Sequence, residues 1–122
     1  MIEDAFCFAH EINIDGYEIA GPYFGSQRHI DGFVAGLFRK YHQFNPDDTE
    51  FFTNRVYPVF RGVAQFYRGN LTYNEEYGAY MLPEWLSISE FGMKPNTLDA
   101  VMNAAFALRQ AAEYLKRDPH LF

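Results

Sequence analysis

Residues 45–68, NPDDTEFFTNRVYPVFRGVAQFYR, carry the clearest fold signal in this sequence of 122 residues. Asn45 is a helix-capping residue type, Pro46 suits the first helical position, and the two aspartates that follow favour the positive end of a helix dipole. Apolar residues then recur at three- and four-residue steps, at Phe51, Phe52, Val56, Val59, Phe60, Val63 and Phe66. We therefore predict a helix that ends near residue 68 and is kinked or split at Pro58, because proline removes a backbone donor.

A second amphipathic pattern precedes this helix and a third follows it. The first runs from Ile30 to about residue 43 and continues with Phe33, Val34, Leu37, Phe38 and Tyr41. The last begins after Thr97, a capping residue type, and ends at Pro119. Its apolar positions are Leu98, Val101, Ala105, Leu108, Ala112 and Leu115.

The segments between these patterns are rich in turn-forming residues. Residues 1–29 contain glycines and a proline with no helical period, so we predict a loop-rich N-terminal segment. Residues 71–96 mix Tyr, Gly and Pro in a long connection with short strands, a length that is typical of functional loops. The fold class predicted for the single domain 1–122 is mainly α: an antiparallel helical hairpin plus a third helix.

The charge and residue composition of the chain argue against several classes of function. The formal net charge is −6 and the basic residues are scattered, so we expect no nucleic-acid partner. No apolar run approaches the ~20 residues of a membrane span, and Cys7 is alone, which excludes an internal disulfide. No metal-binding or nucleotide-binding motif is present, so we predict no cofactor. The cellular compartment is left open.

Three segments resemble the glycoside hydrolase family of acid trehalases, maltose phosphorylases and kojibiose phosphorylases. Residues 21–31, GPYFGSQRHID, are similar to the family's Gly-Pro stretch and Gln-Tyr-His-Ile-Asn turn, with Arg28 in place of the Tyr. The stretch 45–67 is similar to a family helix with an acidic start and a Tyr-or-Trp-Pro pair. Glu90-Phe91 followed by 98–103, LDAVMN, resembles the family's Asp-Glu-Phe element and the helix start that follows it.

This resemblance implies an (α/α)6 barrel of the six-hairpin glycosidase superfamily, of which the chain would form a segment. It also implies cleavage of an α-glucosidic bond with inversion, with Glu90 as the general acid. Such an acid needs shelter from water, and we expect Glu90 to lie near Trp85 and Ile88. Glu84, in a Pro-Glu setting, is the rival for this role.

The resemblance further implies saccharide contacts from Gln27 and His29 at the start of the first helix. His29 is equally well explained as a helix-capping residue. Trp85 can stack on a sugar ring or fill the core beneath the loop. Because aromatic residues make up 19% of the chain, both uses of an aromatic side chain must be weighed.

Three helices cannot close a barrel that uses twelve helices, and the family's base or phosphate-binding groups lie beyond the matched segments. We therefore expect no appreciable glycosidase or phosphorylase activity from this chain alone. We also expect uncovered apolar helix faces that favour self-association or a partner chain. The alternative function is that of a small acidic helical protein of the inhibitor or immunity type, which binds another protein through aromatic residues.

Overall fold

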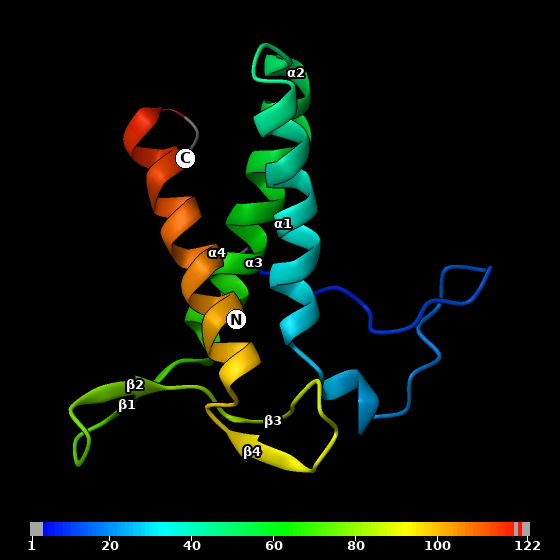
Figure 1. Ribbon diagram of the computed structural model, residues 1–122, viewed down its shortest axis with the longest axis vertical. Coiled ribbons are helices and arrows are strands. Elements are labelled where there is room, and N and C mark those ends of the chain that lie inside the picture. Colours follow the sequence, from blue (N-terminus) through cyan, green and yellow to red (C-terminus); the bar gives the residue numbers. More distant parts are fainter. Residues whose placement is uncertain (1–3, 119, 121–122) are drawn as a thin grey trace.

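Three long helices and two small β-hairpins make up the computed structural model, which describes residues 4–118 and 120 (Figure 1). The long helices are α1 (His29–Phe44), α3 (Tyr57–Asn70) and α4 (Leu98–Arg117), and a short α2 (Thr49–Phe51) leads into α3. The mainly α fold predicted from the sequence is confirmed, including the helical hairpin and the third helix. The proline predicted to stop α4, Pro119, lies outside the described residues.

The turn between α1 and α2 differs from the prediction that Asn45 caps the second helix. Asn45 instead ends α1, where its backbone N–H and its side-chain amide both donate to the Tyr41 carbonyl at 3.0 Å. The N-cap is Asp48, whose carboxylate accepts the Phe51 N–H at 3.0 Å and the Tyr41 hydroxyl at 3.0 Å. The helix therefore begins at Thr49, because Asp48 satisfies a free N–H of its first turn.

The helix predicted to be kinked or split at Pro58 runs without a break from Thr49 to Asn70, with a local irregularity just before the proline. A π-helical turn, Phe52–Val56, joins α2 to α3, and Pro58 lies in the first turn of α3. A proline ring clashes with the carbonyl four residues earlier in a regular α-helix. The wider π turn relieves this clash without breaking the helix axis.

α1 and α4 run parallel, and α3 runs antiparallel to both (Figure 1). Side chains of α1 and α4 are in contact at three successive levels along the two helices. His29 lies beside Asp99, Arg39 Nε donates to Gln110 Oε1 at 2.7 Å, and the ring of His42 lies 6.4 Å from that of Tyr114. Close approach at the lower end requires Gly32, because a Cβ there would overlap the Asn103 side chain.

The core lies where α3 faces α1 and α4. Its upper part contains Phe60, whose ring makes edge contacts with Phe106 at 5.6 Å and with Tyr114 at 5.4 Å. Its lower part contains Tyr67 and Trp85, with the indole stacked on Phe66 at 5.8 Å. Small residues of α4 pack between these rings: Ala100, Ala104, Ala107 and Ala111.

The long connection 71–96 forms two antiparallel hairpins, as short strands were expected to do. The first pairs β1 (Thr72–Asn74) with β2 (Ala79–Met81) and projects away from the helices (Figure 1). The second pairs β3 (Glu84–Leu86) with β4 (Met93–Pro95) below the N-terminal ends of α1 and α4. The N-terminal segment is loop-rich as predicted, with a 3-10 turn over Phe24–Ser26.

α1 buries a different face from its apolar one. Its buried residues are His29, Asp31, Gly32 and Ala35, whereas Phe33 and Leu37 are 51% and 67% exposed. α4 likewise leaves apolar residues exposed, since Leu98 and Met102 are 74% and 62% exposed. The periodicity therefore predicted the helices correctly, and in the described part of the chain each apolar stripe is covered only in part, since Phe38 and Leu108 pack against the core while the residues above stay exposed.

Candidate functional site

Three of the five residues predicted for the site, Gln27, His29 and Glu90, lie around the N-terminal ends of α1 and α4, and Gln27 connects two of the elements there. This side chain is only 3% exposed and precedes α1. Its Nε2 donates to the carbonyl of Ser87 at 3.2 Å and to Glu90 Oε1 at 3.4 Å. The start of α1 is therefore tied to the loop between β3 and β4.

Glu90 lies in a tight turn of that loop. Its φ of 60° is left-handed, a conformation that is uncommon for a residue with a side chain, and its N–H donates to the Ser87 carbonyl at 2.9 Å. The Tyr23 hydroxyl donates to the Glu90 carbonyl at 3.4 Å. Glu90 is exposed, which differs from the sheltered position expected for a general acid, because Ile88 and Phe91 on either side of it point into solvent rather than over it.

His29 and Asp99 form a buried pair beside this turn. The His29 Nδ1 lies 3.3 Å from Asp99 Oδ2, and the side chains are 5% and 15% exposed. The same carboxylate oxygen accepts the N–H of Ile88 at 2.9 Å, so Asp99 also fixes the loop that carries Glu90. Burial lowers the pKa of His29, and the Asp99 carboxylate acts in the opposite direction. A largely neutral imidazole can accept or donate one hydrogen bond at neutral pH.

A layer of buried polar groups lies beneath this pair. Asp31 is fully buried, and its Oδ1 accepts the N–H of Phe8. The guanidinium of Arg28 donates to the Phe8 carbonyl at 3.3 Å, and the Tyr67 hydroxyl donates to the Arg28 carbonyl. Burial raises the pKa of Asp31 to about 6, although the Phe8 N–H and Arg28 act in the opposite direction. The layer fastens the N-terminal segment to α1 and α3.

Sequence reasoning did not select Asp99 or Asp31 as site residues. Asp99 lies in the first turn of α4, where a carboxylate is expected from the helix dipole alone. Asp31 has the corresponding place in α1. For Asp31, the available sequence signal was the run 27–31, QRHID, in which four polar residues gather at a predicted helix start, and the structure buries all four of them. A buried polar run at a helix start indicates a specific hydrogen-bonded network.

The two remaining predicted residues differ in their surroundings. Trp85 is 9% exposed and its ring stacks on Phe66, so the indole fills the core beneath the loop, and this burial accounts for it without a sugar ligand. Glu84 is exposed at the start of β3, opposite Pro95 in the strand register. No contact recorded for the described residues joins Glu84 to the Glu90 turn, so Glu90 remains the better placed of the two carboxylates.

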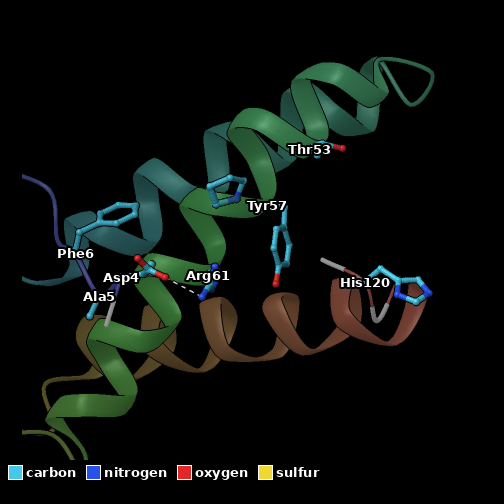
Figure 2. A pocket seen from close by; sticks show the side chains of 9 residues that line it. Asp4, Ala5, Phe6, Thr53, Tyr57, Arg61 and His120 are labelled. Atoms are coloured by element: carbon cyan, nitrogen blue, oxygen red, sulfur yellow. Dashed lines mark ion pairs between the residues drawn. The ribbon is translucent and has the colours of Figure 1, made fainter. Parts of the chain in front are cut away.

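A hollow of about 610 Å³ lies elsewhere, between the N-terminal segment and the start of α3 (Figure 2). Phe6, Tyr57 and His120 line it, and Arg61 is paired with Asp4 at 2.8 Å. None of the predicted site residues lines this hollow.

Across residues 4–118 and 120, no group of three or more His, Cys, Asp and Glu side chains is arranged to hold a metal ion. Within the same part of the chain, no helix has both the length and the apolarity that crossing a bilayer requires.

Comparison with known proteins gives no relative from which a function can be transferred. The chain matches no protein-family model, no curated protein and no solved structure. Function must therefore be argued from the site itself.

Proposed function

We propose that this chain is a segment or a short relative of an α/α-barrel carbohydrate-active enzyme that acts on α-glucosidic bonds of the trehalose, maltose or kojibiose type. Glu90 is its acid, and Gln27 and His29 contact the sugar. The observation that carries the proposal is the meeting of Gln27, His29 and Glu90 at one end of the helices. These three residues come from two of the three segments in which the family resemblance is found.

The helix arrangement supports the barrel. Successive antiparallel hairpins arranged in two concentric rings make neighbours within one ring parallel. α1 and α4 are parallel neighbours, and α3 is antiparallel to both of them. A parallel pair of helices with an antiparallel third helix is what a segment of such a barrel would contain.

The chemistry of the cluster supports sugar binding. The Glu90 carboxylate and the His29 imidazole are hydrogen-bonding groups of the kind that recognise hydroxyls, and the Asp99 carboxylate lies 3.3 Å from the imidazole Nδ1. Glu90 is open to solvent, so protonation of a departing glycosidic oxygen requires further cover from bound sugar or from other barrel helices. The chain alone is therefore expected to bind saccharide weakly and to show no turnover.

Titration with trehalose, maltose and kojibiose, followed by amide NMR, tests this function. We expect shifts confined to residues 27–31 and 87–92, and we expect the Glu90→Gln variant to lose most of them. The absence of shifts in these segments at saturating sugar would contradict the proposal. Measurable turnover by the chain alone would contradict the expectation that it is inactive.

The second candidate function, an acidic protein-binding domain, is favoured by a different observation. Tyr73, Tyr77 and Tyr80 are between 53% and 69% exposed on the β1–β2 hairpin, where a monomeric enzyme has no use for them. In the sugar titration this function predicts no response from the Glu90 turn. The two candidates are therefore separated by one experiment.

A further inference from the structure

An open apolar groove runs along the outer side of the parallel pair α1 and α4. Two neighbouring hollows of about 430 and 370 Å³ lie here, and Arg39 and Phe106 line both of them, so the two adjoin on this face; together they are called the groove. Gly36 leaves room on the α1 side, since a Cβ there would meet only the Phe106 ring at 3.8 Å. The apolar lining is Phe33, Leu37, Met102, Ala105 and Phe106.

The rim of this groove is positively charged, in a chain whose net charge is −6. Arg39, Lys40 and Arg109 line it. Arg39 is held in place by Gln110 and lies over the Phe106 ring at 5.9 Å. The acidic member of the lining, Glu113, is paired with Lys116 at 2.9 Å. Among the described residues, neither Lys40 nor Arg109 forms an ion pair, so the groove has cationic groups available to an acidic partner.

The β1–β2 hairpin has the complementary composition. β1 pairs only with β2, and the hairpin extends from the helices as an arm (Figure 1). The rings of Tyr73 and Tyr80, which are opposite each other in the register, lie 5.2 Å apart in an edge contact. The tip adds an exposed Tyr77 and the exposed carboxylates Glu75 and Glu76. The arm thus offers aromatic surface with negative charge at its end.

We propose that the groove binds the β1–β2 arm of a second copy of this chain, so that two copies exchange arms around a twofold axis. Tyr77 packs against Leu37 and Met102 at the groove, while Glu75 and Glu76 face Lys40 and Arg109. A reciprocal exchange closes the assembly at two copies, because each groove is occupied by the partner's arm.

The dimensions of the two surfaces agree. Three-residue strands extend about 10 Å, and the eight residues from Phe33 to Lys40 rise about 10 Å along α1. Six tyrosines, three from each copy, contribute on the order of 100 Å² each, and the grooves they cover contribute a similar area. The total of about 1,200 Å² lies at the lower end of the range for specific interfaces.

Charge reversal tests the pairing directly. Analytical ultracentrifugation over a concentration series should show a reversible dimer, and Glu76→Arg or Arg109→Glu alone should weaken it about tenfold. Mixing these two variants should restore dimer formation, since both arm–groove contacts of the mixed dimer then pair opposite charges, one with the charges reversed and one as in the wild type. A chain that stays monomeric at every concentration would overturn the proposal. So would a dimer that neither reversal weakens.

The aromatic contribution has a matched control in Tyr17. Tyr77 and Tyr17 are both exposed loop tyrosines, at 69% and 75%. Tyr77→Ala should weaken the dimer by at least tenfold and Tyr17→Ala should leave it unchanged. An equal effect of the two substitutions would mean that the contact is not at the arm.

Cross-linking keeps the proposal testable if an arm variant folds poorly. In a Cys7→Ser background, one chain carrying Tyr77→Cys is mixed with another carrying Leu37→Cys and oxidised. The expected product is a disulfide-linked heterodimer, which requires an arm of one copy in the groove of the other. If the chains are folded and the mixture gives homodimeric cross-links but no heterodimeric one, the proposed exchange of arms is wrong.

Discussion

α3 and α1 are both amphipathic helices, but they use their apolar residues in opposite ways. α3 buries its large apolar residues, with Phe60, Val63 and Tyr67 all fully inaccessible. α1 leaves Phe33 and Leu37 exposed and buries Asp31 and Gly32 instead. The difference shows that an apolar stripe predicts where a helix forms but not which neighbour covers the stripe. In this chain α3 is the interior helix, while α1 and α4 present apolar surface outward.

The largest effect expected from this contrast is a difference in stability between two core-type substitutions. Phe60→Ala on α3 should cost about 3–5 kcal/mol, because it removes the ring contacts with Phe106 and Tyr114. Leu37→Ala on α1 should change the free energy of unfolding by less than about 0.5 kcal/mol in the monomer. Urea unfolding at low protein concentration measures both. If the two substitutions lowered the free energy of unfolding equally, the Leu37 side of α1 would be as buried as the Phe60 side of α3.

Asp31 on the buried face of α1 should give a smaller, pH-dependent effect. Its folded pKa of about 6 lies above its ordinary value, so the folded state holds a proton that the unfolded state has lost between about pH 4 and pH 6. The contribution of Asp31 to stability is therefore fully present below this window and falls as the pH rises through it. The loss amounts to about 2–3 kcal/mol by pH 7.

Asp31→Asn isolates this contribution, since the amide keeps an oxygen that can accept the Phe8 N–H. The difference between the unfolding free energies of variant and wild type should grow in the variant's favour from pH 4 to pH 7. Chemical denaturation at a series of pH values measures it. A difference that is constant with pH would show that Asp31 titrates alike in the folded and unfolded states.

Local rules account for the parts of the fold that the sequence predicted. The helix of 45–68, an irregularity close to Pro58 and the turn-rich connections all follow from residue types and their spacing. The sequence did not predict that Asp48, and not Asn45, is the N-cap of α2. Both residue types are good caps, and the choice depends on the Tyr41 hydroxyl of the preceding helix, which donates to Asp48.

The candidate site was predictable only where local sequence motifs mark its residues. Gln27, His29 and Glu90 were selected from local motifs, and contacts that join residues about sixty positions apart bring their segments together. The burial of Trp85 and the position of Asp99 behind His29 depend on tertiary packing. No periodicity or spacing in a single sequence carries that information.

Two glycines of α1 distinguish its tight side from its open side. Gly32→Ala should cost about 1–3 kcal/mol, because the new Cβ overlaps the Asn103 side chain. Gly36→Ala should stabilise the chain by up to about 1 kcal/mol, because its Cβ fits against Phe106 and alanine favours the helix. Thermal unfolding measures both changes. Destabilisation of similar size at both positions would place Gly36 on a covered face.

The smallest effect concerns the junction between the buried layer and the exposed Glu90 turn. Gln27→Ala removes the hydrogen bonds to the Ser87 carbonyl and to Glu90 Oε1, so the turn should open more often by about 1 kcal/mol. Hydrogen exchange at the Glu90 amide should accelerate about fivefold, while exchange in the core of α4 stays unchanged. Tyr23→Phe, which removes a single longer bond at 3.4 Å, is the graded control and should have a smaller effect. Acceleration throughout α4 would instead mean that Gln27 stabilises the whole fold, and Glu90 would then lie on a turn that α1 does not specifically hold.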